Sequence, residues 1–566
     1  MMLAILCAGS LAAQWSGVVD GTVVNSVTRA GIPGVEIRIF TRQGNFQVTQ
    51  SDGSGRFHFE DLEPGEYRFT LTREGFDQPA ERPGGERVVP VTGPQLIRVA
   101  LEMLPLSTLT GRVLDADGEP MAGVTVELLG LSDGTMRRRE SSGADGAFVV
   151  GELLPGRYQL RANPFAENDP EADYMPPDEV ANTAPAGDVE AASTVPLITY
   201  YPSVTVPQQA QPLQIGGLVN EGPYEIRLRT AQAFPVSGTV YDPQGNPAAG
   251  VRLRWMHRSL ATNFNTYLGG TEFFVPMTTL ELEGPSAISA SDGTFFFESV
   301  PESDWTLEGR WLPDPDAAGQ TEQRGTAGLR IPRTGLDRVN LQLNDTFDFV
   351  GEVIAEDAPN GRLFGSLFLV SETSRFPLVG SSDPPGGRLP SDFPNAPAAD
   401  KEAEGHGPLY FVGATPGPYR VLPMQHPLPG TYVAEVLYGG RDVLGQTIQL
   451  TANPPPLQVI LEKGAGSLDV HLKGREAGDP DVSLVLLPVD ANAAELPRSR
   501  QCSGADACPL ANLSPGEYWV GAFDRTDRRM LLRPEFRPDL TRLMTRATVR
   551  RDGSTVLELD VKRWPE

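Results

Sequence analysis

The chain has 566 residues and a formal net charge of −26. A chain of this length exceeds what one hydrophobic core can organise, so several domains are expected. The strong negative charge argues against a general nucleic-acid binder and favours a soluble protein. The 60 glycines and 52 prolines are scattered between apolar runs, which indicates many short strands joined by tight turns.

The first residues predict a secretory signal peptide at 1–13. This segment (MMLAILCAGSLAA) is a short apolar run that ends in small residues, with cleavage expected after Ala12 or Ala13. The basic residues that usually begin such signals are missing. A lipoprotein anchored through Cys7 is the alternative, although Ala4-Ile5-Leu6 is a poor lipobox. No later stretch holds 18 apolar residues, so no transmembrane helix is expected.

A recurring order of strand signals follows. A unit opens with Gly-x-Val, continues through an alternating strand such as 32–39, and reaches an Asp-Gly turn before a phenylalanine-rich strand. Asp-Gly between alternating apolar residues is a strong hairpin signal. Such alternation, with a period of two, predicts strands that are buried on one side only.

A Pro-Gly-x-Tyr corner comes next in four units, and unit three carries an altered copy of it between Pro301 and Trp305. Proline and glycine supply the turn, and the aromatic residue after it can bury its ring and bond to nearby backbone. The corner aromatics are Tyr67, Tyr158, Trp305 (after one extra residue), Tyr419 and Tyr518. We interpret them as core residues rather than ligand platforms.

Each unit begins with a Gly-x-Val strand and ends with one more alternating strand after the corner. Pairing these first and last strands divides the chain into five predicted β-sandwiches in tandem, an all-β fold of Ig-like or prealbumin-like type. The expected bounds are 15–104 for unit one, 105–231 for unit two, 232–344 for unit three, 345–463 for unit four and 464–566 for unit five. Unit two carries an acidic, proline-rich insertion at 166–194, expected to be an extended loop. Unit five contains the only predicted helix, at 534–545. The units are expected to be self-contained, like beads on a string.

The order G-x-V, P-x-x-G-V-x-V, D-G-x-F and L-x-P-G-x-Y resembles the carboxypeptidase regulatory-like (transthyretin-like) β-sandwich superfamily. That group includes collagen-adhesin B-type repeats and the starch-binding-like carbohydrate-binding fold. Tyr200-Tyr201-Pro202 and Gly439-Gly440-Arg441-Asp442-Val443 are similar to segments of large, secreted, multi-repeat bacterial proteins. The resemblance implies an extracellular or envelope location and, in several members, carbohydrate binding. It specifies fold more strongly than function.

No catalytic constellation is apparent, and we predict neither an enzyme nor a cofactor or metal site. The five histidines lack the spacing of a zinc hydrolase, and no Gly-x-Ser-x-Gly motif occurs. Calcium binding at Asp115-Ala116-Asp117-Gly118-Glu119 is an alternative, but a hairpin turn already requires these residues. The four lysines all lie after residue 400, so lysine–asparagine isopeptide bonds are impossible in units one to three.

Candidate ligand-binding residues are aromatics outside the strand pattern, because sugar rings stack on exposed aromatic faces. They are Tyr200, Tyr201 and Trp311. Trp255 continues the face of Val251 and Leu253 and is expected in the core. Packing of the insertion onto its own sandwich is the alternative for the two tyrosines.

Unit five contains two further candidate features, a disulfide and an arginine-rich segment. Cys502 and Cys508 are expected to form a disulfide in an oxidising compartment, whereas a metal pair lacks further nearby ligands. Residues 525–551 hold nine arginines against three acids, which could contact an anionic surface or form a solvated helix face.

The sequence therefore predicts a non-enzymatic, secreted or envelope-associated binding protein. Polysaccharide or a cell-surface glycan is the leading partner by resemblance, and nucleic acid is not expected. The alternative is a structural spacer or adhesin stalk of the cell surface with no small ligand.

Overall fold

A computed structural model of the chain describes residues 17–565 with gaps. The gaps are 42–45, 79–87, 132–135, 167–192, 217–219, 261–263, 269–270, 276–277, 314–319, 356–364, 372–376, 395–404, 423–427, 476–480, 491–495, 503–506, 525, 527–530 and 532–535. The described residues are almost entirely strands, arranged as tandem β-sandwiches, with a short helix in unit five. This confirms the predicted fold class. The predicted signal peptide and nearly all of the acidic insertion lie outside the described residues.

Units one and two each form two facing sheets. The strands of unit one are β1 (Gly17–Asn25), β2 (Glu36–Phe40), β3 (Phe46–Gln50), β4 (Arg56–Leu62), β5 (Gly65–Thr72), β6 (Phe76–Asp77), β7 (Val88–Val91) and β8 (Leu96–Pro105). Unit two contains β9 (Ser107–Leu114), β10 (Thr125–Gly130), β11 (Met136–Ser141), β12 (Ala147–Leu153), β13 (Gly156–Asn163), β14 (Ser193–Pro196), β15 (Thr199–Tyr200), the 3-10 turn η1 (Pro207–Gln209), β16 (Leu213–Ile215) and β17 (Asn220–Arg227).

Units three and four have more strands. Unit three contains β18 (Thr230–Tyr241), β19 (Arg252–Leu260), β20 (Phe264–Leu268), β21 (Thr271–Val275), β22 (Thr278–Ile288), β23 (Thr294–Pro301), β24 (Asp304–Trp311), β25 (Gln323–Arg330), β26 (Leu336–Gln342) and β27 (Asn344–Asp345). Unit four contains β28 (Phe347–Ile354), β29 (Ser366–Val370), β30 (Leu378–Ser381), η2 (Pro385–Gly387), η3 (Pro390–Asp392), β31 (His406–Ala414), β32 (Gly417–Val421), β33 (Thr431–Tyr438), β34 (Arg441–Asp442), β35 (Thr447–Leu450) and β36 (Leu457–Lys463).

Unit five completes the chain. It contains β37 (Gly466–Leu472), β38 (Val482–Pro488), β39 (Arg498–Cys502), β40 (Cys508–Leu513), β41 (Gly516–Phe523), the helix α2 (Arg537–Thr541), β42 (Thr545–Val549), β43 (Ser554–Leu559) and β44 (Val561–Lys562). The helix is shorter than the predicted 534–545, and part of that range is not described. Among the described residues, no helix has the length and apolar character needed to cross a bilayer.

All five units share one plan. The opening strand pairs antiparallel with the phenylalanine strand and parallel with the closing strand, as β1 does with β4 and β8. The same arrangement joins β9 to β12 and β17, β18 to β23 and β26, β28 to β31 and β36, and β37 to β40 and β43. The remaining strands form the second layer, which in unit one has the order β3-β2-β5-β7. In unit four, β30 pairs with both β29 and β31 and so joins the two layers into one nine-stranded sheet.

Each unit encloses its own main apolar cluster between its layers. The clusters draw their residues from 19–103, 109–228, 234–343, 349–461 and 468–559. Trp255 is fully buried in the cluster of unit three, as predicted. Such burial on one side of each strand is the expected result of a period-two pattern.

The corner aromatics behave as the sequence predicted. In every unit the ring is buried and its polar atom bonds to the residue four positions earlier. Tyr67 donates to the Glu63 carbonyl (3.0 Å), Tyr158 to Leu154 (2.7 Å), Trp305 to Pro301 (2.9 Å) and Tyr518 to Ser514 (2.7 Å), while the Tyr419 hydroxyl bonds to Thr415 Oγ1 (3.1 Å). One signature therefore closes all five sandwiches by the same contact.

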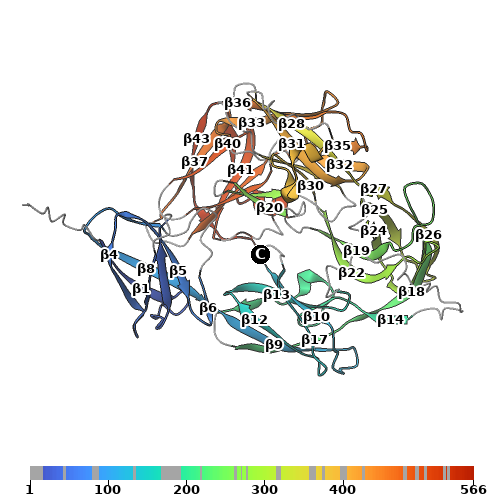
Figure 1. Cartoon of the computed structure of the whole chain (residues 1–566), viewed down its shortest axis with the longest axis horizontal. Helices are drawn as coiled ribbons and strands as arrows, with labels where there is room; N and C mark the ends of the chain where they lie inside the picture. Colours follow the sequence, from blue (N-terminus) through green and yellow to red (C-terminus); the bar gives the residue numbers. More distant parts are fainter. Residues whose placement is uncertain are drawn as a thin grey trace, which may run out of the picture.

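The prediction of self-contained units is wrong at two points. Strand β14 of unit two pairs with β18 of unit three. The hairpin β20–β21 of unit three reaches unit five, where β21 pairs with β39 and extends a seven-stranded sheet. Figure 1 shows unit one (blue) at one end, while the green hairpin at β20 lies among the orange and red strands of units four and five.

A separate apolar cluster seals this junction. Phe273 from β21 packs with Phe368, Val370 and Leu422 of unit four and with Leu496 of unit five. The guanidinium of Arg498 lies 4.7 Å from the centre of the Phe273 ring. Units three, four and five therefore share a core contact in addition to their own cores.

Candidate functional site

Tyr200 is buried rather than placed on an open surface. It is only 4% exposed and packs with Leu129 and Ile198, on the outer face of its own sandwich. Arg161 Nη1 donates to its hydroxyl at 3.1 Å, and Arg161 Nε lies 2.6 Å from Glu127 Oε2. A ring buried in this way offers no face for a sugar to stack on.

Tyr201 and Trp311 are partly buried and belong to different units. Tyr201 lies against the core of unit two, with its ring edge-to-face on Tyr224 at 5.2 Å. Trp311 ends β24 and packs against the core of unit three. The three aromatics proposed from the sequence thus lie in separate clusters, and the structure does not combine them into one binding platform.

Cys502 and Cys508 are joined, with an S–S distance of 2.00 Å. The bond connects β39 and β40, which belong to the two different sheets of unit five. It therefore links the layers of that sandwich next to the strand that receives the hairpin of unit three.

The arginines of 525–551 that the structure describes are largely engaged. Arg542 pairs with Asp539 at 2.9 Å, Arg546 pairs with Glu517, and Arg551 reaches Glu462 of unit four at 3.3 Å. These carboxylates offset the positive charge on which an anionic-surface contact would depend.

The aspartates weighed as calcium ligands hold their own turns. Asp115 Oδ1 accepts hydrogen bonds from the backbone N–H groups of Asp117 and Glu119, both at 2.9 Å. Across the described ranges, no group of three or more His, Cys, Asp or Glu side chains is arranged to hold a metal ion.

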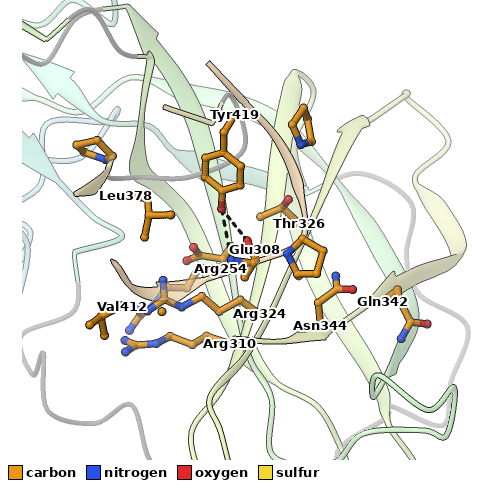
Figure 2. Close-up of a pocket in the computed structure, with 16 residues that line it drawn as sticks. Arg254, Glu308, Arg310, Arg324, Thr326, Gln342, Asn344, Leu378, Val412 and Tyr419 are labelled. Atoms are coloured by element: carbon orange, nitrogen blue, oxygen red, sulfur yellow. Dashed lines mark hydrogen bonds between the residues drawn. The ribbon is translucent and has the colours of Figure 1, made fainter. Parts of the chain in front are cut away.

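A cavity of about 550 Å³ lies between units three and four. Unit three contributes polar side chains from β19, β24, β25 and β27 of its five-stranded sheet and Gln342 from β26 of its other sheet, and unit four contributes mainly apolar groups from β30 to β32 (Figure 2). The lining residues are Arg254, Glu308, Arg310, Arg324, Gly325, Thr326, Gln342, Asn344, Pro377, Leu378, Val412, Gly413, Thr415, Pro416, Pro418 and Tyr419. We call it the inter-unit cavity.

Strand register explains why charged groups gather there. Two cross-strand rows run over β19, β24, β25 and β27; one contains Arg252, Arg310, Arg324 and Asn344, and the other contains Arg254, Glu308 and Thr326. The alternate residues, such as Leu253 and Leu307, face the core. The outer face of this sheet is therefore polar, and unit four covers it.

Glu322 organises the guanidinium groups of the first row. Arg324 binds it through two nitrogens, at 2.7 and 2.9 Å, and Arg310 bonds to the same carboxylate. Burial raises the pKa of Glu322, but the hydrogen bonds and charges of Arg324 and Arg310 outweigh burial and hold that pKa below its usual value. Burial lowers the pKa of Arg324, and Glu322 more than reverses this, so Arg324 stays charged.

The side of the cavity that belongs to unit four is held by its own contacts. Tyr419, the corner aromatic, bonds to Thr415, and Figure 2 shows both bonds above the arginines. The backbone N–H of Gly413 donates to Asp348 at 2.9 Å, and Asp348 pairs with Arg388 at 2.7 Å. A fixed wall of this kind favours a preformed site.

The arrangement suits binding of a polar ligand. Guanidinium, hydroxyl and amide groups donate hydrogen bonds from unit three, and prolines offer apolar surface from unit four. The sequence analysis missed these residues. The signal was present in Arg252-Leu253-Arg254 and Glu308-Gly309-Arg310, where charge recurs at every second position, but the strand pairing that collects them was not visible.

Comparison with solved structures finds several pilins and one further bacterial protein, all at low TM-scores. The Bacillus anthracis TIE protein is 11% identical with a TM-score of 0.17, and the match covers 58% of this chain and 50% of that structure. The Streptococcal ancillary pilin is 11% identical with a TM-score of 0.17, and the match covers 58% of this chain and 98% of that structure. GBS52, the minor pilin of Streptococcus agalactiae, is 12% identical with a TM-score of 0.20, and the match covers 38% of this chain and 95% of that structure. Such scores support no inference about function.

Comparison with curated proteins gives no match. The sequence signature of the Carboxypeptidase regulatory-like domain matches residues 18–101 and 108–170. These two segments lie in units one and two, where the strand and corner motifs are most complete. The resemblance inferred from those motifs is therefore confirmed: the first two sandwiches are similar to the carboxypeptidase regulatory-like domain.

Proposed function

We propose that the chain is a non-enzymatic, secreted or envelope-associated binding protein that holds a carbohydrate in the inter-unit cavity. The observation that carries this proposal is the composition of the cavity wall. Arg, Thr and Asn side chains supply donors for hydroxyl groups on one side, and prolines with Tyr419 supply apolar surface for C–H groups on the other. A volume of 550 Å³ falls within the range of roughly 300–1,000 Å³ for small-ligand sites.

The proposed site replaces the aromatic residues that the sequence alone suggested as ligand-binding candidates. Tyr200 is closed off by its contacts, and Tyr201 and Trp311 pack against separate cores. The cavity instead needs two adjacent units, which gives the tandem arrangement a role in binding. We also propose that the boundaries near 104, 231, 344 and 463 separate five sandwiches, each with its own core.

A glycan array probed with the full chain tests this proposal. Asn344 lines the cavity, so Asn344→Ala should weaken every genuine hit about fivefold or more by removing one ligand hydrogen bond. Asn340→Ala is the matched control, because Asn340 is exposed on β26 of the same unit. Hits that survive Asn344→Ala unchanged would place carbohydrate binding elsewhere, and an array without hits would argue against it.

A structural spacer is the second candidate, and the strand pairing between units favours it. Because β21 completes a sheet of unit five, units three to five are connected by backbone hydrogen bonds as well as by linkers. Such a body would resist bending and project a surface from the cell. Single-molecule stretching separates the two candidates: a pure spacer unfolds at the same force with or without glycans, whereas a ligand seated between units three and four raises the force at which they separate.

A further inference from the structure

We propose that the ligand of the inter-unit cavity is an acidic sugar whose carboxylate binds the guanidinium groups of Arg324, Arg310 and Arg254. This inference rests on the proposed function and narrows it to one class of carbohydrate.

The wall carries an excess of positive charge. Three arginines line the cavity, against Glu308 in the lining and Glu322 beside it. By strand alternation Arg252 shares the same face, directly opposite Arg310, which in turn lies opposite Arg324. Like charges directly opposite one another destabilise a sheet. Glu322 places one negative charge between Arg310 and Arg324, and a bound anion would add a second.

The guanidinium donors of the cavity are oriented so that they can bind a carboxylate. Arg324 uses Nε and Nη2 for Glu322, which fixes the plane of its guanidinium and leaves Nη1 with no hydrogen bond to any described residue. Figure 2 shows Arg254, Arg310 and Arg324 grouped on one side of the cavity. Planar guanidinium groups match carboxylate oxygens well and give hydrogen bonds stronger than neutral ones.

The remaining groups distinguish a sugar from a simple anion. Thr326 and Asn344 lie beyond the arginines in Figure 2 and can bond to ring hydroxyls, and Gln342 can accept a hydrogen bond through its side-chain oxygen. Glu308 repels a carboxylate but accepts hydrogen bonds from hydroxyl groups, so it favours one orientation of the ring. Pro416 and Pro418 supply the apolar surface that sugar C–H groups need, which an inorganic anion would leave unused.

Titration calorimetry of the full chain with D-glucuronate, D-glucose and sodium sulfate tests the inference. Glucuronate should bind at least tenfold more tightly than glucose, because a charged hydrogen bond contributes about tenfold or more in Kd. Arg324→Gln should remove this preference. Arg330→Gln is the matched control, since Arg330 lies on the same strand with its side chain 83% exposed, and it should change Kd less than twofold.

Each result has a defined meaning. Equal binding of glucuronate and glucose would overturn the acidic-sugar inference and leave carbohydrate binding in place. Sulfate binding as tight as glucuronate would also overturn it and identify an inorganic-anion site. No binding of any probe would remove both proposals. If Arg324→Gln melts early, Thr326→Val tests the same cavity without touching the ion pairs and should weaken glucuronate severalfold.

Discussion

At the scale of residues, the units depend on polar atoms that are buried and fully bonded. Besides the corner aromatics, Ser51 and its equivalents Ser142 and Ser289 are buried and repeat one pattern. Each hydroxyl accepts from a valine N–H at 2.9 Å and donates to a carbonyl at 2.7 Å near the start of the second strand. A buried hydroxyl is tolerated when both of its bonds are made, and here it ties a hairpin entry to an Asp-Gly turn.

Arg161 should be among the most sensitive residues of unit two. Its side chain and that of Glu127 are 7% and 3% exposed, and they form an ion pair at 2.6 Å. Arg161→Ala leaves the Glu127 charge buried without its partner, which should cost about 3–5 kcal/mol. Arg138→Ala removes the exposed pair with Glu152 in the same unit and should cost less than about 1 kcal/mol.

Hydrogen exchange of β10 and β13 in the two variants, followed in denaturant, measures these costs. Equal protection in Arg161→Ala and Arg138→Ala would show that the buried pair contributes no more than a surface pair. Loss of protection confined to Arg161→Ala is the expected result.

His58 should titrate at higher pH than an ordinary histidine. Its hydrogen bond to Asp20 at 2.6 Å favours the charged ring and raises the pKa of His58, with a smaller contribution from Glu60 and an opposing one from burial. A raised folded-state pKa adds stability that is complete below the unfolded pKa and is lost as pH rises through the folded value. Because the ring is 54% exposed, the effect on stability is small, and the pKa itself is the better readout.

An NMR titration of the His58 imidazole checks this. Asp20→Asn should lower the pKa of His58, whereas Asp77→Asn, at the opposite edge of the same sheet, should leave it unchanged. A pKa that is insensitive to Asp20→Asn would contradict the assigned cause.

At the scale of elements, the hairpin β20–β21 is the piece that departs from the repeat plan. An unpaired edge strand exposes a row of N–H and C=O groups that can accept another strand. The edge of unit five at β39 is covered in this way by a strand from unit three. The disulfide between β39 and β40 lies at the same edge. The receiving strand β39 is therefore held by strand pairing along its edge and by a covalent link to the other layer of unit five.

Phe273→Ala should loosen this contact. Phe273 is 7% exposed and packs among residues of units four and five, so removing its ring should cost about 3 kcal/mol. Phe46→Ala is the matched control, because that phenylalanine is 65% exposed in unit one and should change stability by less than about 0.5 kcal/mol. Exchange at the amides of β21 and β39 is the measurement. Unchanged protection at both strands would show that the pairing does not depend on this cluster.

At the scale of the whole molecule, unit one stands apart from the connected group of units three, four and five. Among the described residues, the sheets of unit one contain only strands of unit one, whereas a sheet and an apolar cluster connect unit three with units four and five. Neighbouring domains joined only by a linker unfold separately, and domains that share a core tend to unfold together.

Unfolding of the full chain should therefore show at least two transitions. Residues 17–105 should lose exchange protection at their own denaturant concentration, and the strands of units three, four and five should lose it together. Hydrogen exchange read by mass spectrometry across a denaturant series distinguishes these groups. Loss of unit five well before unit three would contradict a shared block.

Local sequence predicted the sandwich and its corner because every element involved lies within a few residues. Pro64-Gly65 makes the turn, the period of two sets which side of each strand is buried, and Tyr67 bonds only four residues back. Turn formation, the alternation of strand faces and a hydrogen bond over four residues depend only on the local sequence, so any chain that carries the pattern can form them. The same reasoning placed Trp255 in the core, since it continues the alternation of Val251 and Leu253.

Only the tertiary structure decided the site and the connections between units. Arg310 and Arg324 meet because β24 pairs with β25, and their face becomes a cavity only because unit four packs against it. Tyr200 was expected outside the strand pattern because it follows an insertion, yet its ring packs on Leu129 and Ile198. Which strand covers an edge and which unit covers a face depend on contacts far apart in the chain, and a periodic pattern contains no information about such partners.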